Sequence, residues 1–305
     1  MHDTGSAHDE LAGSVVLITD CDVPSAEPSA VAAVPAVFVS HNPSQLADVV
    51  IPESELAALV EAVRRAPLAS FALAMLLRFA EERSLEQGLL AESTTYSMLQ
   101  GGPEFLEWRR NYHSTPRVPE IGPVVRVEPT EPGLDITLTR PHVHNAFSRR
   151  MRDELCEALT LAVASGPECH VSIRGSGRSF CSGGDLSEFG SFPSIAESHI
   201  TRLQRSPARL LARLSDRTTV YLHGACMGAG IEVPAYARRV LATPDTTLSL
   251  PEIGLGLIPG AGGTWSIPRR IGRQRTAWLG LTGQRIDAVT AQAWGLVDEI
   301  VEPTA

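Results

Sequence analysis

Strand-type and helix-type segments alternate along this chain from residue 123 to its end, and glycine-rich turns separate several of them. Short runs of apolar and β-branched residues predict strands at 124–129, 134–139, 169–175, 218–224 and 238–244. Apolar residues at three- and four-residue spacing predict helices over 149–164, capped by Asn145 or Ser148, and over 206–216. Such alternation is typical of an α/β fold in which many strands pair in parallel.

The first 118 residues have a different pattern. Two short buried strands are predicted at 14–20 and 35–41, followed by helices over 53–66, 68–84, 85–100 and 103–110. The segment 113–123, "HSTPRVPEIGP", is rich in proline and is typical of a linker. We therefore predict two regions, an N-terminal extension of strands and helices over 1–118 and an α/β domain over 119–305.

Composition excludes several classes of protein. The chain has 305 residues, with 26 Lys plus Arg against 35 Asp plus Glu, so its net charge of −9 argues against nucleic-acid binding by bulk charge. No apolar run is long enough to span a membrane, and the polar N-terminus does not resemble a secretory signal. Five scattered cysteines without a C-x-x-C pair suit a reducing compartment, so a cytoplasmic location without membrane or nucleic-acid partners is expected.

Two glycine-containing turns and two acidic residues are the candidate catalytic features of the sequence. In "FCSGGDL" (180–186), Gly183 and Gly184 allow the backbone to approach a ligand closely. In "CMGAGIE" (226–232), a second small-residue turn opens a helix whose first amides are free donors. Two such amides converging on one oxygen form an oxyanion hole. Glu232 ends the second turn, and Glu252 follows a proline in a third glycine-containing segment, "SLPEIGLG" (249–256). A carboxylate pair in one apolar pocket suits general acid–base catalysis.

Simpler interpretations apply to the same residues. Glu232 alone could be an acid that interacts favourably with the dipole of its helix. The segment "GLGLIPGAGG" (254–263) differs in spacing from dinucleotide-binding patterns and contains a proline, so NAD is not expected. The histidines lack the mutual spacing of metal ligands, so no metal site is predicted.

Taken together, five segments resemble the crotonase family, the enoyl-CoA hydratases and isomerases. The resemblance covers residues 120–302 and depends on the order and spacing of "RPHVHNAF", "SFCSGGDL", "HGACMGAGIE", "LPEIGLGLIPGAGGT" and "LTGQRIDAVTAQAWGLVDEIV". It implies a ββα superhelix, here preceded by a mostly helical N-terminal region, and an acyl-CoA thioester as ligand. It also implies a homo-oligomer, either a trimer or a hexamer, and no cofactor, because coenzyme A is part of the substrate.

The resemblance assigns roles to particular residues. The amides of Gly184 and Ala229 would bind the thioester oxygen, and the two catalytic glutamates of the hydratase branch fall on Glu232 and Glu252. Further substrate contacts are expected from a set of residues near these four: His144, Ala146, Ser182, Gly183, Asp185, Leu186, Gly228, Pro251 and Gly260. The presence of both glutamates at hydratase spacing favours addition of water across a 2,3-double bond.

The sequence departs from the family pattern in two places. Family members usually continue into C-terminal helices that cover the acyl pocket, whereas this sequence ends at Ala305; we hypothesise that the N-terminal helices over 53–111 take over part of this covering role. After Glu232 the family pattern continues with Leu-Ala and a later Asp, but here Pro234 and Arg238 occur. Pro234 is tolerated only in a first helical turn, and Arg238 suggests different surroundings for the acid.

Enoyl-CoA hydration is the leading prediction, and three alternatives remain open. Within the same fold these are a double-bond isomerase and a cofactor-independent dioxygenase acting on dihydroxyphenylacetyl-CoA, which also has a helical N-terminal extension. The third is a catalytically silent, CoA-binding scaffold whose N-terminal half docks a partner. Hydration of crotonyl-CoA, oxygen uptake with an aryl-acetyl-CoA, or binding without turnover would distinguish these functions.

Overall fold

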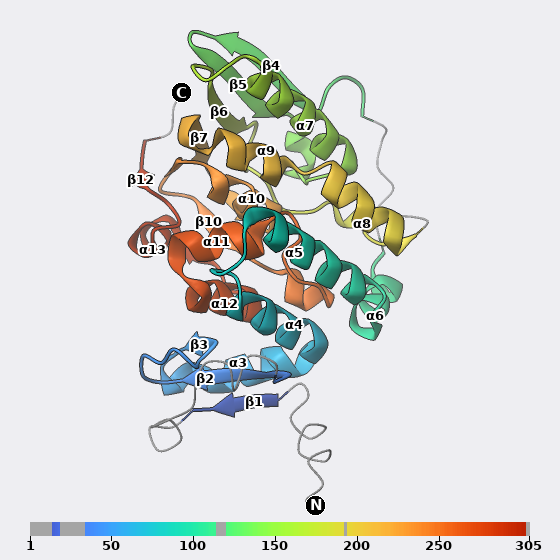
Figure 1. The fold of residues 1–305 in the computed structure, drawn as a ribbon, viewed down its shortest axis with the longest axis vertical. Helices are drawn as coiled ribbons and strands as arrows, with labels where there is room; N and C mark the ends of the chain where they lie inside the picture. Colours follow the sequence, from blue (N-terminus) through green and yellow to red (C-terminus); the bar gives the residue numbers. More distant parts are fainter. Residues whose placement is uncertain (1–13, 19–33, 114–119, 192–193, 303–305) are drawn as a thin grey trace, which may run out of the picture.

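A six-stranded sheet lies at the upper end of the molecule in Figure 1, a computed structural model that describes residues 14–18, 34–113, 120–191 and 194–302. Its strands follow the order β12-β9-β7-β6-β5-β4. The strands are β4 (Val125–Thr130), β5 (Gly133–Leu138), β6 (His170–Gly175), β7 (Thr218–Leu222), β9 (Arg239–Ala242) and β12 (Glu299–Ile300). Only the β4–β5 pair of this sheet is antiparallel; the other neighbours are parallel. The predicted α/β fold with predominantly parallel pairing is confirmed.

A small second sheet determines where the candidate site lies. It contains β8 (Ala225–Met227), β10 (Thr247–Ser249) and β11 (Ile286–Asp287), in the order β11-β10-β8. β8 and β10 are parallel, with Met227 opposite Ser249. The carboxyl ends of the two strands therefore coincide, and the segments that follow them emerge side by side. Those segments carry Glu232 and Glu252.

The helices that follow the predicted linker in sequence pack around these sheets (Figure 1). They are α7 (Arg149–Ala164), α8 (Ile195–Gln204), α9 (Pro207–Leu214), α10 (Ala229–Glu232), α11 (Gly263–Ile271), α12 (Arg273–Thr282) and α13 (Ala288–Trp294). Ser148, one of the two predicted caps, accepts a hydrogen bond from the amide of Met151 at 3.1 Å and caps α7. Asn145 instead adopts positive φ and hydrogen-bonds the backbone of Arg140, Ser176 and Ser179.

The N-terminal region packs directly against the rest of the molecule. It consists of a parallel sheet of β1 (Ser14–Leu17), β2 (Ala36–Ser40) and β3 (Val49–Val50), followed by α3 (Glu53–Arg65), α4 (Pro67–Arg78), α5 (Leu85–Gln100) and α6 (Pro103–Asn111). Leu73 and Leu77 of α4 belong to a hydrophobic cluster that also contains Ile258 and Leu281. Since this cluster includes residues from both sides of the linker, the extension shares a core with α12.

A buried ion pair holds the small N-terminal sheet against α4. The guanidinium of Arg78 donates to both carboxylate oxygens of Asp48, at 2.9 and 2.7 Å, and the two side chains are only 6% and 2% exposed. The same guanidinium also binds the carbonyls of Val34 and Ala36. Charges buried to this degree need such complete pairing because their loss of hydration is costly.

Arg78→Ala is expected to lower the free energy of unfolding by about 3–5 kcal/mol, because it removes the closest counter-ion of the buried Asp48 carboxylate and leaves the more distant Arg273, at 3.7 Å. Urea denaturation followed by circular dichroism measures this loss. Arg64→Ala, at an exposed position of α3, is the matched control and should change stability by about 0.5 kcal/mol or less. Equal stability of the two variants would contradict a structural role for the ion pair.

Candidate active site

Two turns at the ends of β8 and β10 bring the predicted acids together. Gly228 lies between β8 and α10 with φ 49° and ψ −118°, a conformation that favours glycine, and its amide donates to the carbonyl of Ser249 at 3.0 Å. This bond joins the end of β8 to the end of β10. Glu232 ends α10 and is 2% exposed; Glu252 begins the 3₁₀ turn η5 (Glu252–Leu255) and is 9% exposed. Both carboxyl groups line one pocket.

The two predicted oxyanion donors are free and line the same pocket. The carbonyl of Gly183 and the amide of Asp185 pair with Phe147, at 2.7 and 3.0 Å, so the amide of Gly184 lies between two fixed neighbours. Ala229 occupies the first position of α10, where an amide has no intrahelical acceptor. Within the part of the chain that the structure describes, neither amide donates a hydrogen bond. Each is therefore available to an oxygen of a bound molecule.

Glu252 has an unsatisfied carboxyl oxygen. Its Oε2 is buried and makes no hydrogen bond to any described residue. Burial raises the pKa of Glu252 to about 8. A backbone hydrogen bond opposes this rise, and the negative charge of Glu92 adds a smaller effect in the direction of burial. At neutral pH this carboxyl group is mostly protonated, so it can act as a proton donor.

Glu232 is held by the turn that precedes α11. Its Oε2 accepts hydrogen bonds from the amides of Ala261 and Gly263, at 2.7 and 2.9 Å. Burial and the nearby charges of Glu252 and Glu92 raise its pKa well above the usual value, while the two amides act in the opposite direction. The hydrogen bonds fix one carboxylate oxygen, and the side chain also lines the pocket.

A third buried acid, which the sequence analysis did not identify, comes from the N-terminal extension. Glu92 on α5 is 3% exposed and accepts hydrogen bonds from the amides of Gly262 and Thr264, at 2.7 and 2.9 Å, and from the Thr264 hydroxyl at 2.6 Å. Burial raises its pKa to about 7, opposed by these hydrogen bonds and by the charge of Arg202. The only signal in the sequence is the position of Glu92 four residues after Gly88 and four before Tyr96, on one helical face.

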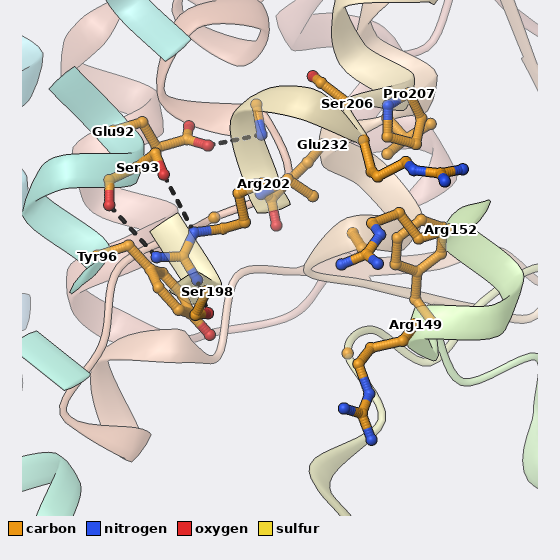
Figure 2. Close-up of a pocket in the computed structure, with 18 of the residues that line it drawn as sticks. Glu92, Ser93, Tyr96, Arg149, Arg152, Ser198, Arg202, Ser206, Pro207 and Glu232 are labelled. Atoms are coloured by element: carbon orange, nitrogen blue, oxygen red, sulfur yellow. Dashed lines mark hydrogen bonds between the residues drawn. The ribbon is translucent and has the colours of Figure 1, made fainter. Parts of the chain in front are cut away.

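The extension supplies one wall of the pocket. Leu89, Glu92, Ser93, Tyr96 and Gln100 of α5 line it. Figure 2 shows Glu92, Ser93 and Tyr96 on one side, with Arg149 and Arg152 of α7 on the other. The pocket is thus enclosed partly by a helix from residues 53–111, the segment for which we hypothesised a covering role.

Of the residues predicted to form the site, the structure places some in the lining of the pocket and others outside that lining. Gly184, Asp185, Ala229, Glu232, Glu252 and Gly260 line the pocket. The others are absent from its lining in the described chain: His144, Ala146, Ser182, Gly183, Leu186, Gly228 and Pro251. Asp185 is engaged in a buried ion pair with Arg140 at 3.0 Å, and His144 Nδ1 hydrogen-bonds Ser179 at 3.0 Å. These contacts support the loops around the site.

The departure from the family pattern after Glu232 has a local explanation. α10 ends at Glu232, and Pro234 begins a separate 3₁₀ turn, η4 (Pro234–Tyr236), where its missing N–H has no required partner. Arg238 is exposed and lies outside the pocket lining. Arg238 is thus not the source of different surroundings for Glu232 in the pocket; the charges that act on this acid are those of Glu252 and Glu92.

Solved structures of similar fold define the class of protein. An enoyl-CoA hydratase from Thermoplasma volcanium matches with a TM-score of 0.55 and 29% identity over 60% of this chain and 73% of that chain. One from Mycobacterium smegmatis matches with a TM-score of 0.54 and 29% identity, over 60% of this chain and 71% of that one. The fold is therefore that of the crotonases.

Sequence relatives place the chain more specifically. The family model for enoyl-CoA hydratase/isomerase matches residues 134–305, and the chain belongs to this family of enzymes. Over 179 residues it is 36% identical to a probable enoyl-CoA hydratase of Rhodobacter capsulatus, spanning 58% of this chain and 68% of the relative. It is 31% identical over 174 residues to the 1,2-epoxyphenylacetyl-CoA isomerase of Escherichia coli, covering 55% of this chain and 66% of the relative. In the described ranges, no helix has the length and apolar character that crossing a bilayer requires.

Proposed function

We propose that this protein is an enoyl-CoA hydratase-type enzyme that adds water across the 2,3-double bond of an acyl-CoA thioester. One observation supports this function most strongly: the free amides of Gly184 and Ala229 line the same pocket as Glu232 and Glu252. Two free donors can stabilise negative charge on a thioester oxygen, and two adjacent acids can handle the protons of water. Hydratase names among the relatives agree with this proposal.

In the proposed reaction, Glu232 and Glu252 hold one water molecule between them. Glu232 acts in its ionised form, to which the amides of Ala261 and Gly263 donate, and takes a proton from this water as the water oxygen forms a bond to the β-carbon of the substrate. The electrons of the double bond move toward the thioester, and the amides of Gly184 and Ala229 stabilise the resulting enolate oxygen. Glu252 then gives its proton to the α-carbon, which re-forms the thioester carbonyl. Transfer of the proton from Glu232 to Glu252 then restores the starting state of both acids. The sum is addition of H and OH across the double bond, and no cofactor apart from the coenzyme A of the substrate takes part.

Three assays distinguish this function from the alternatives. Loss of the enoyl-thioester absorbance of crotonyl-CoA, with formation of 3-hydroxybutyryl-CoA, would support hydration. Conversion of a 3-enoyl-CoA into its 2-enoyl isomer without hydration would instead support an isomerase, and oxygen uptake with dihydroxyphenylacetyl-CoA a dioxygenase. Binding of acyl-CoA without turnover in any of these assays would support a scaffold. A homo-oligomer and a cytoplasmic location remain predictions.

The proposed roles lead to a pH dependence. Glu252 must be protonated to deliver its proton, and its pKa of about 8 keeps it so at neutral pH. We therefore expect kcat for crotonyl-CoA to fall as pH rises through about 8, as this carboxyl group loses its proton. Steady-state kinetics between pH 6 and 10 measure this limb. An alkaline limb that persists unchanged in Glu252→Gln would assign the titration to another group.

A further inference from the structure

Helix α5 of the N-terminal extension packs tightly on the segment that leads into α11. Gly88, Glu92 and Tyr96 are four residues apart and share one face of the helix. A Cβ atom at Gly88 would overlap the ring of Trp265, and one at Gly260 would lie 2.5 Å from Tyr96 Cδ2. Glu92 lies between these two close contacts. Its carboxylate is thus set against the 260–265 backbone with little freedom to move.

Glu92 and Glu232 accept hydrogen bonds from alternate amides of this backbone. Glu232 accepts from the amides of Ala261 and Gly263, whereas Glu92 accepts from those of Gly262 and Thr264. Four consecutive amides at the start of α11 are thus held by two carboxylates from different parts of the chain. The first amides of a helix lack intrahelical acceptors and favour negative charge, so both carboxylates have suitable partners.

The position of this backbone also determines the position of Glu232. A Cβ atom at Gly263 would lie 2.5 Å from Glu232 Cγ, so the backbone at this residue touches the side chain of the acid. We propose that Glu92 is a positioning residue for Glu232. By accepting hydrogen bonds from the amides of Gly262 and Thr264, it holds in place the turn whose other two amides orient the Glu232 carboxylate. The extension is thereby part of the catalytic apparatus. The activity readouts below rest on the proposed function.

Several charged or titratable groups surround Glu92. Glu232 of α10 and Glu252 of η5 both experience its negative charge, as do Tyr236 of η4 and Tyr96 of α5 itself. Arg202 of α8 provides the opposite charge. Its guanidinium donates hydrogen bonds to Ser93, Ser97, Ser198 and Gln100. Figure 2 shows Arg202 beside Ser93 and Tyr96. Removing the charge of Glu92 should therefore lower the pKa of both catalytic acids.

Glu92→Gln tests the proposal because it retains the shape and one acceptor oxygen but removes the charge. We expect kcat for crotonyl-CoA to fall about 10- to 100-fold, since small displacements of a catalytic group have effects of this size, with KM within about twofold of the wild type. The alkaline limb of the pH profile should move to lower pH. Hydrogen–deuterium exchange of peptides covering 258–268 should become faster.

Leu99→Ala is the matched control, because it destabilises the same helix at a buried position outside the pocket lining. It should leave kcat and the alkaline limb unchanged. If Glu92→Gln fails to fold, Thr264→Val replaces it: this variant removes one of the three hydrogen bonds to Glu92 and should lower kcat to a smaller extent without changing KM. Wild-type kcat in folded Glu92→Gln, or kcat losses shared equally by Leu99→Ala, would overturn the proposal.

Hydrogen exchange tests the positioning role of Glu92 independently of hydratase activity. If the wild-type protein does not hydrate crotonyl-CoA, the assigned reaction fails, but the role of Glu92 is still decided by exchange. Faster exchange over 258–268 in both Glu92→Gln and Glu232→Gln, but not in Leu99→Ala, would support joint positioning of the turn. Unchanged exchange in Glu92→Gln would contradict it.

Discussion

Glu252→Gln is expected to lower kcat for hydration of crotonyl-CoA by about 100- to 10,000-fold, the range typical of a lost general acid. The wild-type carboxyl group has a pKa of about 8 and a buried oxygen without a hydrogen-bond partner among the described residues. Glutamine has nearly the same shape and fills the same space, but it cannot give a proton to the α-carbon. The loss should therefore appear in kcat, measured at saturating substrate.

The control for this variant is binding. Calorimetric titration with butyryl-CoA, a saturated analogue that cannot be hydrated, should give the same affinity for Glu252→Gln and the wild type. Glu232→Gln should cause a loss of similar order, since both acids serve the same reaction, and the double variant should lose much less than the product of the two effects. Full hydratase activity in either single variant would refute the proposed mechanism.

Gly228→Ala should abolish most activity and also destabilise the fold. Gly228 has a backbone conformation that costs other residues about 1–3 kcal/mol, so the free energy of unfolding should fall by at least this amount. In addition, a Cβ atom there would overlap Oε1 of Glu252 and displace this acid from the pocket. We expect a loss in kcat/KM of about 100-fold or more, since misplacement of a catalytic group by about 1 Å has effects of this order.

Two glycines provide matched controls that separate strain from steric overlap. Gly272 also has positive φ, but a Cβ atom there meets no other atom within 4 Å, so Gly272→Ala should reduce stability without reducing kcat. Gly254 lies in η5 beside the site, and its Cβ would likewise meet no atom within 4 Å. Gly254→Ala should leave the active site intact. If Gly228→Ala retains wild-type kcat/KM at a temperature where it is folded, the assigned contact with Glu252 is unimportant.

Much of the fold could be predicted from local pattern. The helix expected over 149–164 has the same bounds as α7, because its apolar spacing and its cap at Ser148 agree. The helix predicted over 68–84 extends too far, because α4 ends at Arg78. Ser84 forms a capping box with Gln87 at the start of α5, and a residue in that role cannot end the preceding helix. α8 was not predicted at all.

The candidate site could be predicted only where its residues lie close together in sequence. The glycine turns and the two acids beside them form recognisable patterns, and the structure brings Gly184, Ala229, Glu232 and Glu252 to one pocket. Glu92 lies 140 residues before Glu232, in a helix that also carries Glu86. An acid on a helix is ordinarily solvated, and only tertiary packing against the amides of 262 and 264 distinguishes Glu92. No local rule contains that information.

The parallel pairing of β8 with β10 also limits where this chain tolerates changes in length. The two strands end in register, with Met227 opposite Ser249, and each leads directly into an acid-bearing turn. One extra residue in either strand would move its acid by about 3.3 Å and reverse the facing of the side chains beyond it. The turn after Thr243, by contrast, lies at the opposite ends of these strands, where Pro244 and Asp245 form the loop. Insertions for labelling or engineering therefore belong in that loop, while the strands themselves act as spacers of fixed length.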